Sequence, residues 1–155
     1  MPTLKKGRLL FLAIASLFLA NCASTSKSSG DKDADAKTFP VNDTKGVVYL
    51  YRPGRVFAGS VQTPIKINGF DAGGTGPGTY FKWELDPGKY VFSCSTEGSS
   101  KAVELDLQPG KLYFINQDYR FEVVHGAKVV MAEVKESKGK TDVGSCKLLI
   151  STYVK

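Results

Sequence analysis

Strict alternation of apolar and polar side chains over residues 79–85 is the feature that most restricts how this chain can fold. In the run TYFKWEL, Phe81, Trp83 and Leu85 occupy every second position, and Tyr80 belongs to the opposite set. Successive side chains of a β-strand point to opposite faces, so a period of two indicates a strand that is buried on one face. We expect the first set to enter a core and Tyr80 to face outward.

Similar runs continue from Gly46 onward, separated by Pro-Gly and Asn-Gly pairs that are typical of tight turns. The expected strands are residues 47–52, 61–67, 79–85, 89–95, 102–107 and 111–117, followed by a hairpin of 121–124 and 128–134 about His125-Gly126. Seven or eight short strands at this spacing predict an all-β fold, a small antiparallel β-sandwich.

The end of the chain departs from the period of two. Val143, Cys146, Leu149 and Ile150 recur at helical spacing after Asp142, a residue type that caps helices. We therefore expect one short C-terminal helix beginning after Asp142.

The first 21 residues have the three parts of a secretory signal peptide. Lys5, Lys6 and Arg8 precede the apolar run of residues 9–20, and small residues follow it. A membrane-spanning helix needs about 20 apolar residues, and this run is well short of that length. Export is the better interpretation.

The stretch Leu19-Ala20-Asn21-Cys22 resembles the lipobox of bacterial lipoproteins. The resemblance implies that Cys22 is acylated and becomes the mature N-terminus. Asn21 departs from the Gly, Ala or Ser usual at its position; ordinary cleavage that leaves Cys22 as a plain thiol is the alternative. Ala23 is not the Asp that retains lipoproteins in the inner membrane, so the resemblance implies a bacterial envelope protein anchored in the outer membrane.

Residues 22–44 are rich in Ser, Asp and Lys and hold little apolar surface. Such a composition cannot offset the cost of ordering, and it predicts a flexible linker after the lipidated Cys22. Residues 45–155 then form a single domain.

Four runs of the domain resemble domain-of-unknown-function family 2846, which is itself similar to PEGA-type β modules. The runs are VVYLYRP, IKINGFDAGG, TYFKWELDPGKYVFSC and LQPGKLYFINQ. The resemblance covers residues 46–150 or so and implies a PEGA-like or Ig-like sandwich. The family brings no catalytic residues.

Two cysteines remain once Cys22 is assigned to lipid. Cys94 lies on the inward face of its expected strand, and Cys146 lies on the apolar stripe of the expected helix. In an oxidising compartment we expect a disulfide between Cys94 and Cys146; two separate core thiols are the alternative.

No combination of residues predicts catalysis, a cofactor or a metal site. His125 is the single histidine, it falls in an expected turn, and neither a nucleophile–base pair nor a set of zinc ligands accompanies it. The formal charge of +6 falls to +3 without the leader, and the basic residues are not clustered, so nucleic acid is not an expected partner.

The stretch of residues 68–78 is the candidate binding loop, because flexible glycine-rich loops on rigid sheets often bind ligands. The candidate binding residues are five residues of this loop and the outward-facing tyrosine that follows it: Asn68, Gly69, Asp71, Gly74, Gly76 and Tyr80. The sequence thus predicts a membrane-anchored, non-catalytic structural or adaptor module with a protein partner in the envelope. The alternative is a binder of envelope glycan or a small ligand through residues 68–78.

Overall fold

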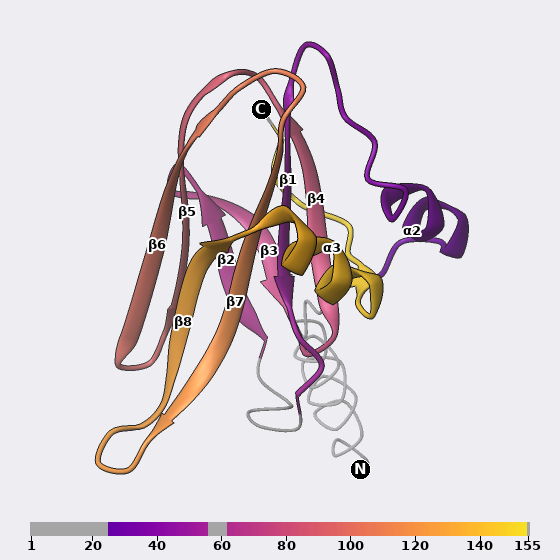
Figure 1. Cartoon of the computed structure of the whole chain (residues 1–155). Helices are drawn as coiled ribbons and strands as arrows, with labels where there is room; N and C mark the ends of the chain where they lie inside the picture. The colour runs from indigo at the N-terminus through magenta and orange to yellow at the C-terminus, as the bar shows by residue number, and fades with distance from the viewer. Residues whose placement is uncertain (1–24, 56–61, 155) are drawn as a thin grey trace, which may run out of the picture.

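A computed structural model of the chain describes residues 25–55 and 62–154; the expected signal peptide and Cys22 lie outside the described residues (Figure 1). The described helices are α2 (Gly30–Ala36) and α3 (Glu136–Gly144). The strands are β1 (Gly46–Arg52), β2 (Thr63–Ile67), β3 (Phe70–Thr75), β4 (Thr79–Leu85), β5 (Gly88–Thr96), β6 (Ser99–Leu107), β7 (Leu112–Glu122), β8 (Gly126–Val134) and β9 (Lys147–Leu148).

These strands form two sheets, of order β8-β7-β1-β4-β9 and β3-β2-β5-β6. Figure 1 shows the sheets as two layers, with α2 and α3 on the outer side of the five-stranded sheet. The expected all-β sandwich with a short helix near the C-terminus is confirmed. The pairs β1–β7 and β4–β9 are parallel, while the other pairs are antiparallel. Alternation of apolar residues shows which face of a strand is buried, but it does not show the direction of the neighbouring strand. The sequence therefore did not reveal the two parallel pairs.

The main core lies between the two sheets. Phe81, Trp83 and Leu85 of β4 are all at most 6% exposed, as the alternation predicted. The rings of Phe81 and Trp83 stack with their centroids 5.0 Å apart, and Phe92 of β5 lies 5.9 Å from the Trp83 ring. Trp83 Nε1 donates to Ser151 Oγ at 2.8 Å, so the polar atom of this buried indole is satisfied.

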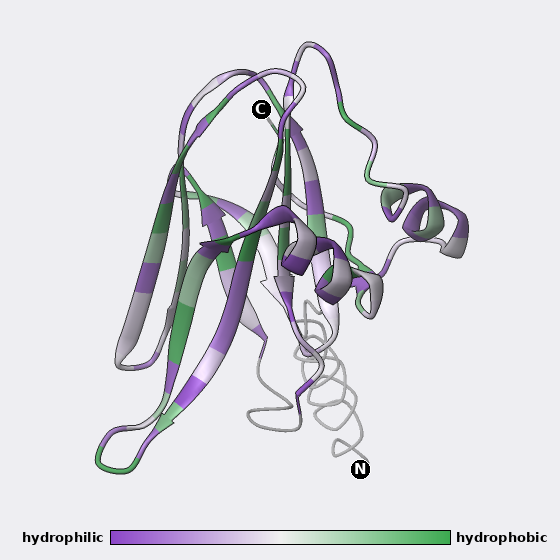
Figure 2. Ribbon diagram, viewed as in Figure 1, coloured by the Kyte–Doolittle hydropathy of each residue, from purple (hydrophilic) through white to green (hydrophobic). Residues whose placement is uncertain are grey.

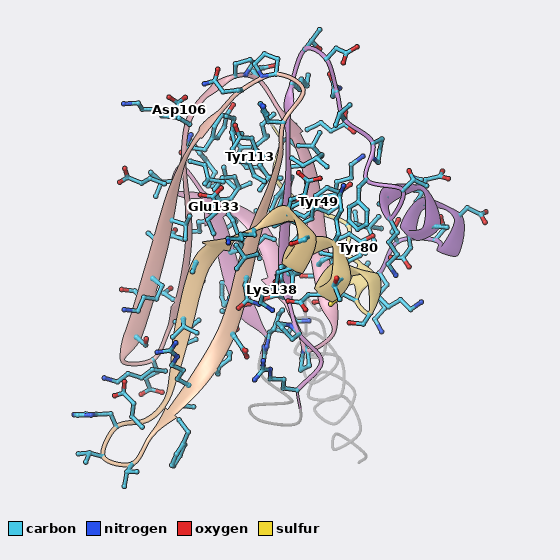
Figure 3. All side chains as sticks on the ribbon, in the orientation of Figure 1. Tyr49, Tyr80, Asp106, Tyr113, Glu133 and Lys138 are labelled. Atoms are coloured by element: carbon cyan, nitrogen blue, oxygen red, sulfur yellow. The ribbon has the colours of Figure 1, made fainter. Side chains whose placement is uncertain are left out.

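A second apolar cluster covers the outer face of the five-stranded sheet. Every residue of β1 is buried, which requires cover on both of its faces. Tyr49 and Tyr80 point to the outer face, and Figure 3 shows both on the side of the sheet that carries the helices. The ring of Phe114 stacks on Tyr49 at a centroid distance of 5.1 Å. Helix residues Ala36 and Val143 complete this cluster.

The expectation of a flexible linker is wrong for residues 25–44, which pack on the sheet. Ala36 of α2 is 4% exposed, and its carbonyl oxygen accepts a hydrogen bond from Tyr49 Oη at 2.8 Å. The Asp33 carboxylate accepts a hydrogen bond from the Leu148 N–H at 2.9 Å. Composition could not reveal this order because much of the apolar surface that holds the segment belongs to the sheet.

The C-terminal helix begins before Asp142 and not after it. The helix α3 ends at Gly144, and Lys147–Leu148 form β9, which pairs with β4. Val143 and Cys146 have no exposed surface, in accord with the apolar spacing. The spacing therefore predicted the burial of Val143, Cys146 and Leu149 correctly, but Ile150 is 54% exposed. Backbone pairing of β9 with the edge of β4 makes the end of the segment extended.

Candidate functional site

A groove of about 620 Å³ lies along the edge of β3. This strand is the end of the four-stranded sheet and is paired with β2 alone. The groove is lined by Thr25, Ser26, Gln62, Pro64, Asp71, Gly73, Gly74, Ile150 and Thr152. Three segments that are distant in the sequence meet here: the residues that follow Cys22, the glycine-rich stretch and the C-terminal segment.

Residues from both ends of the described chain cap the edge of β3. The Gly74 N–H donates to Thr25 Oγ1 at 2.8 Å. The Ala72 carbonyl oxygen accepts hydrogen bonds from the Thr152 N–H at 3.3 Å and from Ser151 Oγ at 2.9 Å. Unpaired groups on an edge strand are a template for pairing with another chain. With these groups occupied, a ligand in the groove would contact mainly its walls.

Gly73 shapes the floor of the groove. Its φ is +112°, and a Cβ there would lie 2.9 Å from Cζ of Phe81 and 3.4 Å from Cγ2 of Thr25. Only glycine satisfies both the backbone conformation and the close packing. The expectation of a flexible loop is therefore wrong for residues 70–75, which form β3.

The groove carries little charge. Among the described residues that line it, Asp71 has the one ionisable side chain, and its Oδ1 lies 3.8 Å from Nζ of Lys66. Both side chains are exposed, so this pair contributes about 0–1 kcal/mol to stability. Ile150, 54% exposed, and Pro64 supply apolar surface. Apolar side chains beside glycine backbone suit a neutral, extended ligand better than a highly charged one.

Three of the six residues predicted for the binding loop form turns at opposite ends of β3. Asn68 and Gly69 have φ values of 51° and 85° in the expected tight turn between β2 and β3. Asn68 Oδ1 accepts a hydrogen bond from the Val91 N–H at 2.8 Å, which ties this turn to β5. Gly76 lies in the turn before β4, where its N–H donates to Thr79 Oγ1 at 3.0 Å.

Of the remaining three, Asp71 and Gly74 line the groove and Tyr80 does not. The expectation that Tyr80 is exposed is wrong: it has no exposed surface, and its hydroxyl donates to the Asp33 carbonyl oxygen at 3.4 Å. Burial raises the pKa of this hydroxyl above its ordinary value. Alternation assigned Tyr80 to the correct face, but it could not show that a helix covers that face.

Sequence reasoning missed a buried polar layer at one end of the core. Arg52, Thr63, Thr75 and Gln117, from four different strands, are each at most 2% exposed. The Arg52 guanidinium lies over the Tyr119 ring, 4.7 Å from its centroid. The hydroxyl oxygens of Tyr119 and Thr63 are 2.7 Å apart. Arg52 occupies the same face of β1 as the core residues Val48 and Leu50. This position in the alternation was the sequence signal that could have predicted its burial.

The same layer has an incompletely satisfied amide. Thr75 Oγ1 donates to Gln117 Oε1 at 2.6 Å, whereas Gln117 Nε2 is buried with no hydrogen-bond partner in the part of the chain that the structure describes. Burial lowers the pKa of the Arg52 guanidinium, although an arginine stays protonated in proteins. The hydroxyl groups of this buried polar layer are hydrogen-bonded, and the Arg52 guanidinium packs on the Tyr119 ring.

Cys94 and Cys146 do not form the expected disulfide; both are free and buried. Cys94 belongs to the core between the sheets, and Cys146 belongs to the cluster on the outer face. The five-stranded sheet thus lies between them, whereas a disulfide needs Cα atoms within about 7 Å. Burial raises the pKa of both thiols to about 11. The alternative of two separate core thiols is correct.

The remaining sequence candidates lie apart from the groove. His125 is exposed in the β7–β8 turn, with Nδ1 3.4 Å from Oε2 of Glu122. Within residues 25–55 and 62–154, no group of three or more His, Cys, Asp or Glu residues is placed to hold a metal ion. The helices of this described part are too short or too polar to cross a membrane.

The fold and the groove define a small two-layer β-sandwich whose glycine-containing edge strand is capped by both ends of the domain. Residues 42–129 match the family described as "Protein of unknown function (DUF2846)", and the chain belongs to this family. A Haemophilus influenzae protein described as uncharacterized is 28% identical over 139 residues, which cover 87% of this chain and 80% of that protein.

Proposed function

We propose that this protein is an envelope lipoprotein, anchored in the outer membrane through acylated Cys22, whose sandwich is a non-catalytic structural or adaptor module. The leader and the stretch Leu19-Ala20-Asn21-Cys22 support the anchor. The groove beside β3 is the observation that carries the binding role. Its occupant is a segment of a protein partner.

The chemistry of the groove supports a polypeptide as its occupant. Ile150 and Pro64 offer apolar surface, and Gln62 and Thr152 offer polar groups. Among the described residues that line the groove, Asp71 carries the single charge. Because Thr25, Ser151 and Thr152 already occupy hydrogen-bonding groups of β3, a peptide would bind mainly through side-chain contacts with the walls of the groove. Such a partner needs no dense array of charges.

A binder of envelope glycan or of another small ligand is the second candidate. Asp71 and Gly74, two residues of the 68–78 stretch, line the groove and favour it. This candidate also relied on an exposed aromatic ring at Tyr80, which is buried. We therefore place it after the protein partner.

Site-specific photo-crosslinking in cells tests the binding role. A photoreactive residue at position 150, in the groove wall, should give a reproducible adduct with one protein, and one at Glu104, exposed on β6, should not. The variant Thr152→Trp, which fills the groove from its rim, should abolish the adduct. Adducts with glycan would favour the second candidate, and equal adducts from both positions would refute a role for the groove.

The intact mass of membrane-extracted protein tests the anchor separately. Acylation of Cys22 should add the mass of two or more acyl chains, and Cys22→Ser should remove this mass. An unmodified mass for the mature chain would overturn the anchoring proposal and leave the groove experiment meaningful.

A further inference from the structure

The β7–β8 hairpin ends in an exposed apolar tip. Phe121, Val123 and Val124 are 61%, 93% and 85% exposed. Figure 1 shows the hairpin projecting past the end of the sandwich, and Figure 2 shows hydrophobic residues at its tip. Contiguous apolar side chains on a surface mark sites of contact with proteins or membranes.

The length of the projection follows from the strand register. Pairing of β7 with β1 ends at Asn116, opposite Tyr51, but β7 continues to Glu122 with β8 as its partner. Six further residues at about 3.3 Å each carry the tip about 20 Å along the strand direction past this point. The core extends along the hairpin as far as the pair Tyr119 and Val129, and Val123 and Val124 lie beyond it.

The expected lipid anchor leaves the domain at the same end. Thr25 contacts Gly74, which is next to the last residue of β3. Gly74 is one pair from Thr63, whose hydroxyl contacts Tyr119 of β7 at 2.7 Å. Only three residue steps separate Thr25 from Cys22, a span of at most about 11 Å. An acylated Cys22 therefore brings the bilayer within reach of the hairpin.

Basic side chains lie directly behind the apolar tip. Arg120 and Lys128 are cross-strand partners, an unfavourable arrangement for like charges. Glu122 Oε2 lies 3.2 Å from Lys128 Nζ and offsets one of them. Arg120, Lys128, Glu122 and Lys101 line a groove of about 410 Å³ beside the β5–β6 turn. This excess of positive charge is complementary to the phosphates of anionic lipids.

We propose that the β7–β8 tip inserts into the interfacial region of the membrane that holds Cys22, with Arg120, Lys128 and Lys101 on headgroup phosphates. The inference rests on the proposed acylation of Cys22 for the location of the bilayer. The domain is then held against the membrane at two points, the acyl chains and the tip. This arrangement fixes its orientation, in contrast to a domain on a long flexible linker.

Fluorescence quenching by lipids tests the insertion. The acylated full-length mature protein, as a Val124→Trp variant, is reconstituted into vesicles of phosphatidylethanolamine and phosphatidylglycerol with brominated acyl chains. The matched control is Val91→Trp on β5, at a position that is 38% exposed on the sheet surface. The native Trp83 is 6% exposed and gives a common background. Thermal unfolding of each variant confirms that it is folded.

The tip tryptophan should emit at shorter wavelength in vesicles and lose about half of its fluorescence to the brominated chains, whereas Val91→Trp should lose none. Adding Arg120→Gln and Lys128→Gln should weaken this quenching. No quenching at position 124 in acylated, vesicle-bound protein would overturn the inference while leaving the anchor intact. The tryptophan emission could also shift to shorter wavelength only when a second protein is added, without quenching by brominated lipid. That result would overturn the inference and indicate a protein contact at the tip.

The unacylated Cys22→Ser chain separates the two proposals. The mature Cys22→Ser chain should still float with anionic vesicles, and this flotation should fall about tenfold in Val123→Asp/Val124→Asp. A mature chain that does not float at all would count against binding of the tip to lipid. Flotation that is unchanged by these two substitutions would count against the tip.

Discussion

Replacing Gly139 with alanine should destabilise this protein, although the same change stabilises most helices. Gly139 is buried in α3, directly over Phe114 of β7. A Cβ built on Gly139 would lie 2.5 Å from Cβ of Phe114 and closer still to two atoms of its ring. Non-bonded carbon atoms prefer separations of about 3.5–4.0 Å. The helix or the ring must therefore move by about 1 Å.

Two opposing effects set the magnitude. Alanine is favoured over glycine inside a helix by about 1 kcal/mol. Overpacking a well-packed site costs about 1–3 kcal/mol, and here the clash involves Cβ and ring atoms of Phe114, which cannot swing away as a flexible chain end can. Displacing α3 also loosens the packing of Val143, which belongs to the helix, and of Cys146, which follows it; neither has exposed surface. We expect a net loss of about 1–2 kcal/mol in the free energy of unfolding.

Urea unfolding of Gly139→Ala measures this loss, and Gly144→Ala on the same helix is the matched control. A Cβ on Gly144 would meet no heavy atom within 4 Å, so this variant should be unchanged or more stable by up to about 1 kcal/mol. Alkylation of Cys146, followed by peptide mass spectrometry, reports the seating of α3 locally. It should accelerate in Gly139→Ala, while Cys94, between the sheets, should remain as slow as before.

The outcome that refutes this reasoning is specific. If Gly139→Ala matches Gly144→Ala in stability and Cys146 is alkylated no faster, α3 does not rest on Phe114 at the described separation.

Three further predictions concern the buried polar groups and thiols. Cys94 and Cys146 should both be alkylated in unfolded protein without reductant. Neither should react quickly in folded protein at pH 8, because burial raises the pKa of both thiols to about 11. A mass of the alkylated protein that depends on reductant would contradict the prediction of two free thiols. Asp33→Asn should cost about 1–3 kcal/mol at pH 7. Burial raises the Asp33 pKa, but hydrogen bonds outweigh it and leave the pKa lowered. That stability is present above the unfolded-state pKa of about 3.9 and is lost as pH falls through the folded-state value, so stepped-pH urea unfolding should show the two proteins converging in acid. Thr75→Val should cost about 1–3 kcal/mol in thermal unfolding because Gln117 Oε1 loses its donor. Gln117→Met should cost less than about 1 kcal/mol, because it removes the unsatisfied Nε2 and the Thr75 hydroxyl can still donate to the Thr63 carbonyl oxygen, 3.4 Å away.

Part of the candidate site could be predicted from the sequence. The glycine-rich stretch contributes Asp71 and Gly74 to the groove, and both were among the expected binding residues. Thr25 and Ile150 were not, because one falls in a polar segment and the other in a segment of helical spacing. Neither signal says that the two segments meet at β3. Only the pairing of strands brings them to one edge.

The sequence by itself determined most of the strands and which faces of those strands are apolar, but it missed β3 (Phe70–Thr75) and β9 (Lys147–Leu148). The alternation over 79–85 placed Phe81, Trp83 and Leu85 in the core, and Asn68-Gly69 placed a tight turn. These features are local: they depend on the period of a strand and on the φ that a turn requires.

The tertiary structure decided what covers each face. Helix α2 buries Tyr80, which the alternation had assigned to solvent, and the five-stranded sheet separates Cys94 from Cys146. It also gave an ordered place to residues 25–44, whose composition predicts disorder. In each case the deciding surface is supplied by residues far away in the chain, and a local pattern carries no information about such neighbours.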